Sequence, residues 1–273
     1  MNLSESSPLG KKSIYSESYD SSLLFSIVRS RNRAQIGIKE KLPFNGCDVW
    51  NAYELSWLNE KGKPIVAIGK LVFPCESPNL VESKSLKLYL NSFNNTRFNS
   101  TEKVVQILTQ DLSRAAGMPV QVEIAELNSV EPSWIGVFQG ICLDELDIEC
   151  EHYQIEPDYL TVSKNPVFEV LYSHLLKSNC LVTNQPDWGS VQIIYKGNKI
   201  NHEGLLKYLI SFRQHNEFHE PCVERIFVDI MRRCQPSELT IYARYTRRGG
   251  LDINPWRSTL SCDVVDNLRL LRQ

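Results

Sequence analysis

The sequence predicts an α+β protein in which one structural unit is used twice. Segments that alternate between apolar and polar residues, typical of half-buried strands, recur in both halves of the 273 residues. Between them lie stretches with the helical spacing of apolar residues. The third observation is an internal repeat, because Tyr-Leu-Asn-Ser-Phe at 89–93 returns as Tyr-Leu-Ile-Ser-Phe at 208–212. We therefore expect antiparallel sheets with helices packed on one face.

In the first half, the predicted order is a polar arm, a strand hairpin, two helices and a strand. Residues 1–20 are rich in serine, and we expect a loosely ordered arm. Residues 54–73 form the hairpin, because two apolar runs flank turn-forming residues at 60–64. The remaining elements are helices at 83–93 and 100–116 and a strand at 120–127.

The second half repeats this order after the acidic residues 143–156, which we interpret as the crossing between the halves. Proline suits the first turn of a helix, and Pro221 therefore marks a helix start. The predicted elements are a strand at 167–176, a hairpin at 190–200 around Lys196-Gly197-Asn198, helices at 203–212 and 221–233, and a closing strand at 238–247.

Two more matches, in the same order along the chain, support a duplication. Arg97-Phe98 corresponds in position to Glu217-Phe218. Asp48-Val49-Trp50, which is followed by a KGKP turn, resembles Asp187-Trp188, which is followed by a KGNK turn. The expected domains are a flexible arm at 1–20, an N-terminal module at 21–145 and a C-terminal module at 146–273.

Charge and hydropathy exclude several classes of protein. The 30 Lys and Arg residues nearly balance 32 Asp and Glu residues, so a large nucleic-acid interface is not expected. No run approaches the ~20 apolar residues of a membrane span. Lys11 and Lys12 are not followed by the apolar stretch of a secretory signal. We expect a cytoplasmic protein without a membrane or direct nucleic-acid partner.

The eight cysteines include no CxxC pair, so a structural zinc site is not expected. In a reducing compartment the default is eight free thiols, most of them buried as small hydrophobic side chains. The useful question is whether one of them has neighbours that activate a thiolate.

Cys180 and Asp187 are the first candidates for catalysis. Cys180 lies at the end of a predicted strand and Asp187 in the loop that follows. This arrangement places a nucleophile and a proton donor on the same side of a substrate. The alternative is a buried structural thiol and an aspartate that caps a turn, and spacing alone favours that alternative.

His219 and Glu220 stand directly before a predicted helix, a short distance after His215. A glutamate can accept two parallel N–H bonds from a polar ring, while histidine supplies one more bond. Equally, Glu220 can simply complement the helix dipole, and the sequence leaves both interpretations open.

Two further segments suit anions. Residues 82–89 open a helix with serine hydroxyls together with Lys84 and Lys87, although a capped amphipathic helix has the same pattern. Residues 247–257 combine arginines with adaptable glycines, which suits phosphate capture but also a solvated loop. Neither a GxGxxG nor a GxxxxGK[ST] motif occurs, so Rossmann and P-loop sites are not indicated.

Four of these segments together resemble the long, two-module form of the NADPH-dependent 7-cyano-7-deazaguanine reductases, the nitrile reductases of queuosine biosynthesis. The resemblance runs from about residue 20 to the C-terminus, and ESKSLKLY fits the family signature at every position. It implies two tandem tunnelling-fold modules, each an antiparallel sheet with a helical pair on one face, in a superfamily shared with GTP cyclohydrolase I. The segments are ESKSLKLYLNSF, LKSNCLVTNQPDWGS, FRQHNEFHEPCVERI and ARYTRRGGLDINPWR.

The resemblance also implies roles at matching positions. Cys180 would form a covalent thioimidate with the nitrile and Asp187 would protonate its nitrogen. It further implies two NADPH per turnover as co-substrate, no metal, the product 7-aminomethyl-7-deazaguanine and a homodimer. The implied substrate-binding residues are Val81, Glu82, Ser83, His219 and Glu220, and the implied NADPH contacts are Lys84, Ser85, Arg248 and Gly249.

The duplication divides these residues between the halves. Aligning the repeats puts Lys41 at the position of Cys180, and Asn99-Ser100 at that of His219-Glu220. We therefore expect one active site per chain where the modules meet, with Glu82 facing Cys180. Two alternatives are a tunnelling-fold purine or pterin hydrolase, which the lack of a Cys/His cluster disfavours, and a non-catalytic binding protein in which Cys180 is inert.

Overall fold

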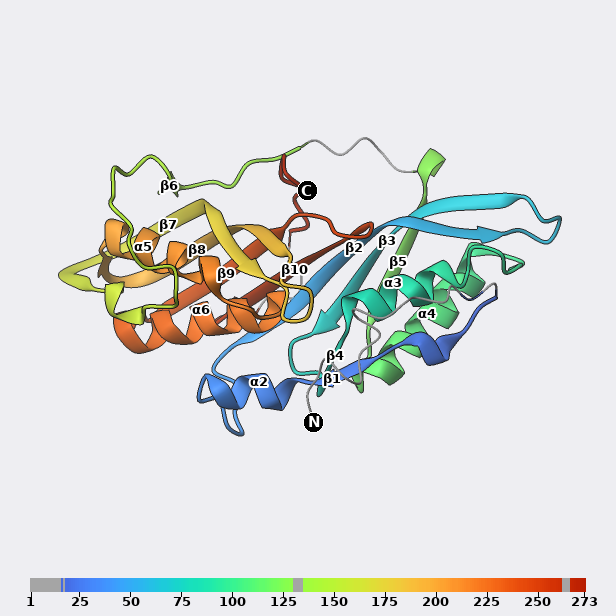
Figure 1. The fold of residues 1–273 in the computed structure, drawn as a ribbon, viewed down its shortest axis with the longest axis horizontal. Coiled ribbons are helices and arrows are strands. Elements are labelled where there is room, and N and C mark those ends of the chain that lie inside the picture. Colours follow the sequence, from blue (N-terminus) through green and yellow to red (C-terminus); the bar gives the residue numbers. More distant parts are fainter. Residues whose placement is uncertain (1–15, 17, 130–134, 262–265) are drawn as a thin grey trace. The chain divides into compact units, whose positions relative to one another are not determined.

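The computed structural model describes residues 16, 18–129, 135–261 and 266–273, and in them it has the predicted α+β character (Figure 1). The α-helices are α2 (Arg29–Gln35), α3 (Ser83–Asn91), α4 (Thr101–Ala116), α5 (His202–Ser211) and α6 (His219–Cys234). The strands are β1 (Ser26–Val28), β2 (Asn45–Leu58), β3 (Pro64–Pro74), β4 (Asn79–Val81), β5 (Gln121–Glu126), β6 (Ile141–Cys142), β7 (Val162–Asn179), β8 (Pro186–Ile200), β9 (Glu238–Tyr245) and β10 (Leu251–Ser258). Short 3₁₀ helices are η1 (Ser21–Leu23), η2 (Leu127–Ser129), η3 (Pro157–Tyr159) and η4 (Phe212–Gln214).

The chain divides into two compact units, each assembled from three segments. The first takes the described residues within Met1–Asn32, Asp48–Ser133 and Arg247–Ile253. The second takes those within Arg33–Cys47, Trp134–Thr246 and Asn254–Gln273. Strands β2 and β10 therefore contribute residues to both units. The predicted modules, in contrast, are continuous stretches, and their boundaries remain predictions.

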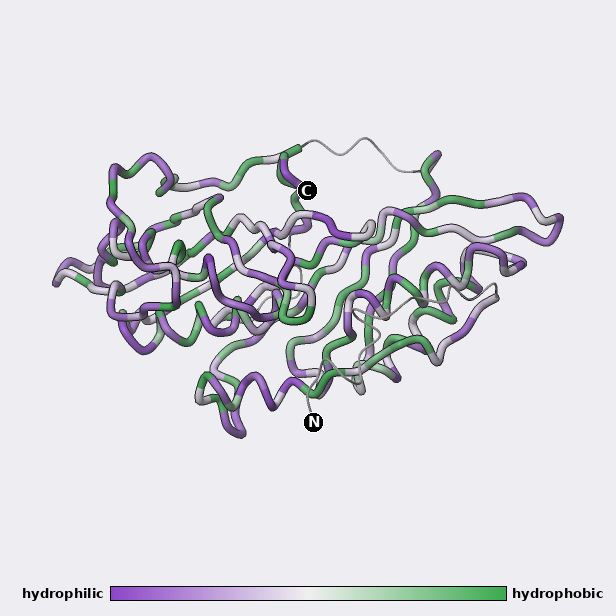
Figure 2. The backbone as a smooth tube through the Cα atoms, viewed as in Figure 1, coloured by the Kyte–Doolittle hydropathy of each residue, from purple (hydrophilic) through white to green (hydrophobic). Residues whose placement is uncertain are grey.

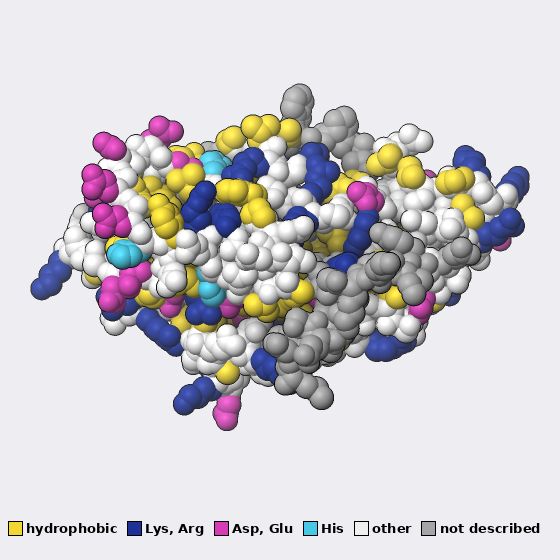
Figure 3. All heavy atoms as spheres, in the orientation of Figure 1, with side chains coloured by type: hydrophobic (Ala, Val, Ile, Leu, Met, Phe, Trp, Pro, Cys, Tyr) yellow, Lys and Arg dark blue, Asp and Glu magenta, His cyan; other side chains and the backbone are white. Residues whose placement is uncertain are grey.

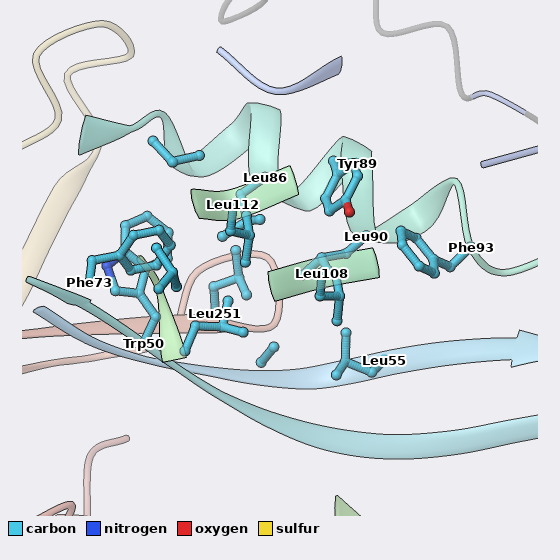
Figure 4. Close-up of a cluster of buried hydrophobic side chains, with 14 of the residues drawn as sticks. Trp50, Leu55, Phe73, Leu86, Tyr89, Leu90, Phe93, Leu108, Leu112 and Leu251 are labelled. Atoms are coloured by element: carbon cyan, nitrogen blue, oxygen red, sulfur yellow. The ribbon is translucent and has the colours of Figure 1, made fainter. Parts of the chain in front are cut away.

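In the first unit, α3 and α4 cover one face of strands that follow the order β5-β3-β2 (Figure 1). The helices present their apolar stripe to the sheet, as the predicted periodicity requires. Leu86, Leu108 and Leu112 are fully buried there and meet Trp50 and Leu55 of β2 (Figure 4). This cluster is the hydrophobic core of the first unit.

The predicted elements of the first unit are confirmed, with small changes at their ends. The hairpin at 54–73 is the distal part of β2 and β3, and its turn is closed by Gly62 with φ +83°. Helix α4 begins after Ser100, whose hydroxyl accepts the N–H of Lys103 at 3.2 Å, and ends at Gly117 in the left-handed region. The short elements α2, β1 and β4 were not predicted.

In the second unit, strands follow the order β10-β9-β8-β7-β6, with α5 packed on β7 and α6 on β8 and β9. Neighbouring strands of β7, β8 and β9 run antiparallel, whereas the two-residue strand β6 joins β7 in parallel. Both helices were predicted from the sequence, and Pro221 lies in the first turn of α6 as expected. Backbone hydropathy in Figure 2 follows the same pattern, with apolar stretches interleaved along the strands and helices.

The predicted hairpin at 190–200 is wrong. Strand β8 continues straight through Lys196-Gly197-Asn198 and pairs along its length with β7, so the turn lies between Asn179 and Pro186. Gly197 is needed for a close contact rather than for a turn, because a Cβ there would lie 2.9 Å from Cα of Pro236.

The sequence left residues 247–257 open between phosphate capture and a solvated loop, but only the first of these residues form a loop. Gly249 and Gly250 form a tight turn with φ +59° and +75°, and the chain then enters β10, which is buried throughout. Arg257 in that strand is completely buried and pairs with Glu224 at 2.9 Å. The strand at 238–247 is therefore followed by one more strand and does not close the sheet.

The repeated pentapeptide is used identically in each unit. At the end of α3, Ser92 Oγ donates to the carbonyl of Tyr89 at 2.6 Å, and at the end of α5 Ser211 Oγ does the same to Tyr208 at 2.6 Å. Each tyrosine hydroxyl then donates to an aspartate at 2.8 Å, and these acceptors are Asp111 and Asp229. Matching contacts at matching positions support the predicted duplication.

Surface charge is mixed on the face drawn in Figure 3. Acidic side chains gather over the loop of residues 143–156, and basic ones over the tip of the β2–β3 hairpin. Among the helices of the described residues, none has the length and apolar character needed to span a membrane.

Candidate active site

Cys180 and Asp187 lie on either side of the turn that joins β7 to β8. The turn is closed by two backbone hydrogen bonds: the N–H of Cys180 donates to the carbonyl of Gln185 at 2.8 Å, and that of Asn184 to the carbonyl of Cys180 at 3.1 Å. Asn184 adopts φ 57°, a left-handed conformation that asparagine accepts more readily than most residues. A hairpin turn thus joins the two residues that carry the thiol and the carboxylate.

A second set of hydrogen bonds ties this turn to the segment that leads into α6. The N–H of Asn179 donates to the carbonyl of His215 at 2.8 Å, and the N–H of Glu217 donates to the carbonyl of Asn179 at 3.1 Å. The side-chain amide of Asn216 adds a bond to the carbonyl of Cys180 at 3.2 Å. The thiol therefore has a fixed position relative to the start of α6.

His219 and Glu220 are the first residues of α6, and the former reaches Asp187. His219 Nε2 lies 3.3 Å from Asp187 Oδ1. Cys180, Asp187, His219 and Glu220 have only 4%, 3%, 7% and 3% of their surface exposed. Burying a carboxylate is costly, and capping a turn or a helix does not require it, so the burial of Asp187 and Glu220 favours a further role for both.

The remaining buried thiols of this unit are poor nucleophiles. Burial raises the pKa of Cys222 to about 12, and the nearby Glu217 acts in the same direction. Burial likewise raises the pKa of Cys234 to about 11. Both are therefore neutral thiols near pH 7, whereas Cys180 shares its turn with Asp187.

Tyr245 of β9 completes this cluster and was not predicted from the sequence as part of a site. Its ring stacks on the imidazole of His219 with centroids 3.9 Å apart and planes 14° from parallel. The strand pattern contains the signal, because Tyr245 shares the inward face with Leu239, Ile241 and Ala243, all of which are buried.

In the first unit, Glu82 is the N-cap of α3. One carboxylate oxygen accepts the N–H of Lys84 and the other that of Ser85, both at 2.8 Å. Burial raises the pKa of Glu82, and these backbone hydrogen bonds oppose that change. Val81 ends β4 beside it and Ser83 begins the helix.

This cap changes the predicted anion site at the helix start. The N–H groups of Lys84 and Ser85 already hold the Glu82 carboxylate, so an external anion would rely on lysine side chains instead. The Lys87 ammonium is paired with Glu54. Gly249 lies against the same helix, because a Cβ at that position would be 3.8 Å from Cγ of Lys87.

The predicted site residues thus fall into two groups. Cys180, Asp187, His219 and Glu220 lie together in the second unit. The first unit holds Val81, Glu82, Ser83, Lys84, Ser85, Arg248 and Gly249. That Glu82 faces Cys180 stays a prediction. Within the described part of the chain, no group of three or more His, Cys, Asp or Glu side chains is arranged to hold a metal ion.

The buried Glu217 makes the second unit sensitive to acid. Burial by itself would raise its pKa, but hydrogen bonds from His215 and Arg225 outweigh burial and lower it. A depressed pKa stabilises the fold above the unfolded value of about 4.3, and that contribution is lost as the pH falls through the folded pKa.

Glu217→Gln is therefore expected to lower the free energy of unfolding by about 1–3 kcal/mol at pH 7, since charged hydrogen bonds are lost. The difference from wild type should shrink below about pH 4. Urea unfolding at several pH values measures both effects, with Glu149→Gln, an exposed glutamate, as control. A variant as stable as wild type at pH 7 would contradict the assignment.

Comparison with known proteins places the chain in a family. Residues 15–124 match the family described as "Nitrile reductase, 7-cyano-7-deazaguanine-reductase N-term", and residues 186–262 match "QueF-like protein". Several curated relatives are named NADPH-dependent 7-cyano-7-deazaguanine reductase. The relative from Legionella pneumophila (strain Lens) is 59% identical to this chain, and the match covers 100% of this chain and 96% of the relative. The relative from Ralstonia nicotianae is 59% identical (98% and 99% covered), and that from Cupriavidus necator is 57% identical (100% and 100% covered). The chain therefore belongs to the family of NADPH-dependent 7-cyano-7-deazaguanine reductases.

Proposed function

We propose that this chain reduces the nitrile of 7-cyano-7-deazaguanine to the primary amine 7-aminomethyl-7-deazaguanine, with NADPH as the hydride donor, in queuosine biosynthesis. Relatives that align with it over 96% and 99% of their length carry the name of this activity. The observation that carries the proposal is the buried cluster of Cys180, Asp187, His219 and Glu220. A thiol and a carboxyl group on one side of a closed turn fit nucleophilic addition coupled to proton transfer.

The first step is addition of the Cys180 thiolate to the nitrile carbon. One π bond of the C≡N group breaks, a C–S bond forms, and Asp187 delivers a proton to the nitrogen, giving a thioimidate. A free nitrile is a poor hydride acceptor, whereas the protonated C=N carbon of this adduct is a good one. This role for Asp187 is supported by its position at the end of the turn that begins at Cys180.

Reduction then takes place in two hydride additions. The first hydride converts the thioimidate carbon to a tetrahedral centre, which expels the Cys180 thiolate and leaves an imine. The second hydride and a proton give the amine, so one nitrile consumes two NADPH and two protons and releases two NADP⁺. The imine must not escape or hydrolyse between the steps, which a buried site favours.

Recognition of the substrate falls to carboxylates and a histidine. Glu220 would accept two N–H groups from the guanine-like edge of the ring, and His219 would hold its neighbouring polar atoms. Glu82, flanked by Val81 and Ser83, would face the ring from the other module. Lys84 and Ser85, with Arg248 and Gly249, would contact NADPH, whose phosphates suit the lysine and arginine side chains.

NADPH consumption tests this function directly. With 7-cyano-7-deazaguanine limiting, NADPH absorbance is expected to fall by two equivalents per nitrile, with the amine as sole product by mass spectrometry. The same assay with 7-deazaguanine, which lacks the nitrile, should show no consumption. Absence of turnover with the nitrile, in protein whose circular dichroism shows a folded chain, would overturn the proposal.

We further propose that the chain works in the cytoplasm as a homodimer, as the family resemblance implies. Small antiparallel sheets leave open edges that assembly covers. Light scattering is expected to give twice the 31.4 kDa chain mass, and a monomer at assay concentration would contradict the dimer.

A further inference from the structure

We propose that Tyr245 is a positioning residue that fixes the imidazole plane of His219 and thereby its approach to Asp187. The inference rests on the proposed function, since it assigns to Tyr245 a role in the same site. Tyr245 lies in β9, and the roles implied at matching positions include none for it.

Stacking is the contact that sets the plane of the His219 ring. Although Nε2 lies 3.3 Å from Asp187 Oδ1, neither ring nitrogen makes a hydrogen bond within the described residues. Histidine rings in binding sites are usually oriented by a bond to one nitrogen, which also selects the tautomer. Here the Tyr245 ring, whose centroid lies 3.9 Å from that of the imidazole and whose plane is 14° from parallel, orients the His219 ring instead. Both nitrogens thus stay available for Asp187 and for a substrate.

The Tyr245 ring is itself fixed from the side of the sheet. Gly189 pairs with Tyr245 across β8 and β9, and a Cβ at Gly189 would lie 3.1 Å from Cε1 and 3.2 Å from Cδ1 of the tyrosine. The glycine therefore makes room for the ring, and Leu176 lies 3.4 Å from the same point. An aromatic ring packed over a cross-strand glycine is confined to one orientation.

The hydroxyl of Tyr245 does not explain its position. Burial raises its pKa well above the ordinary value, and the nearby Cys222, Asp187 and Glu220 act in the same direction. The hydroxyl therefore keeps its proton near pH 7 and lies near the Cys222 thiol. The ring face, not the hydroxyl, is what the site uses.

Two substitutions at Tyr245 separate these functions. Tyr245→Phe keeps the stack and should remain within about threefold of wild type. Tyr245→Leu removes it and is expected to lower kcat/KM for the nitrile about 10- to 100-fold, as a misplaced catalytic contact does. Without NADPH, the rate at which the protein forms its covalent adduct with the nitrile, followed by intact mass, should fall by the same factor. KM for NADPH should stay within about twofold of wild type.

A structural role alone would give a different pattern. Tyr195→Leu is the matched control, because Tyr195 is equally buried on β8 but contacts Glu169 at the far end of the strand. It should lower the melting temperature and leave kcat/KM per folded molecule unchanged. In a His219→Ala background, Tyr245→Leu should have no further effect, since residues that act as a unit are not additive.

If Tyr245→Leu does not fold, Gly189→Ala is the variant to measure, because it displaces the tyrosine ring while retaining every side chain of the cluster. It is expected to lower kcat/KM for the nitrile and to leave KM for NADPH unchanged. If the wild type turns over the nitrile and Tyr245→Leu has the same kcat/KM, the role of Tyr245 is overturned while the proposed function stands. Where Tyr245→Leu does not fold, an unchanged kcat/KM in Gly189→Ala has the same meaning. A fully additive effect in the His219→Ala background would do the same. Failure of the wild type to consume NADPH would instead overturn the proposed function.

Discussion

Replacing Cys180 with alanine is expected to lower NADPH-dependent nitrile reduction by about 10³-fold or more, which amounts to loss of activity in a standard assay. The thiolate converts a nitrile into a reducible C=N carbon, and no other group at the turn can form that bond. Steady-state rates with saturating NADPH measure the effect, and circular dichroism verifies the fold. The expected loss is in kcat, because binding of the deazaguanine depends on other residues.

Cys234→Ala is the matched control for this substitution. Cys234 is as buried as Cys180, at 4% exposed, but its thiol has a raised pKa and lies at the end of α6. Its loss should leave kcat within about twofold. Activity of Cys180→Ala near the wild-type level would show that the nucleophile lies elsewhere.

The second large effect is expected for Asp187→Asn. An amide retains the shape of the carboxylate but delivers no proton, so kcat should fall by about 10²- to 10⁴-fold while KM for the nitrile changes little. The asparagine also replaces the carboxyl group that lies 3.3 Å from His219 Nε2. Steady-state kinetics at saturating NADPH separate the two parameters.

Asp144→Asn serves as control, because Asp144 lies in the same unit and accepts hydrogen bonds from Ser173 and His174 away from the cluster. It is expected to alter stability rather than kcat per folded molecule. If Asp187→Asn retained wild-type kcat, the proton would have to come from another group.

Local patterns predicted most of the fold, and the errors share a cause. Helices α3 to α6 and the β2–β3 hairpin follow from periodicity and capping residues, which are properties of short segments. The predicted hairpin at 190–200 was wrong because Gly197 makes room for Pro236, a residue distant in the sequence, and does not form a turn. Strand β10 was missed because its polar residues, such as Arg257, are neutralised by partners like Glu224 that local composition cannot reveal.

The candidate site shows the same division. The spacing of Cys180 and Asp187 suggested their proximity, and the turn between β7 and β8 supplies it. The approach of His219 to Asp187 depends on the bridge between Asn179 and the segment before α6, which no motif encodes. Tyr245 was missed because a tyrosine on an inward strand face has the pattern of an ordinary core residue.

The most direct test of the proposed mechanism is the intact mass of the protein after mixing with 7-cyano-7-deazaguanine in the absence of NADPH. The thioimidate proposal predicts a gain of one nitrile molecule per chain, mapped to Cys180 by peptide analysis and absent from Cys180→Ala. Loss of the adduct on addition of NADPH, with release of the amine, should follow. An unchanged mass in a preparation that consumes NADPH with the nitrile, or an adduct on another residue, would contradict it.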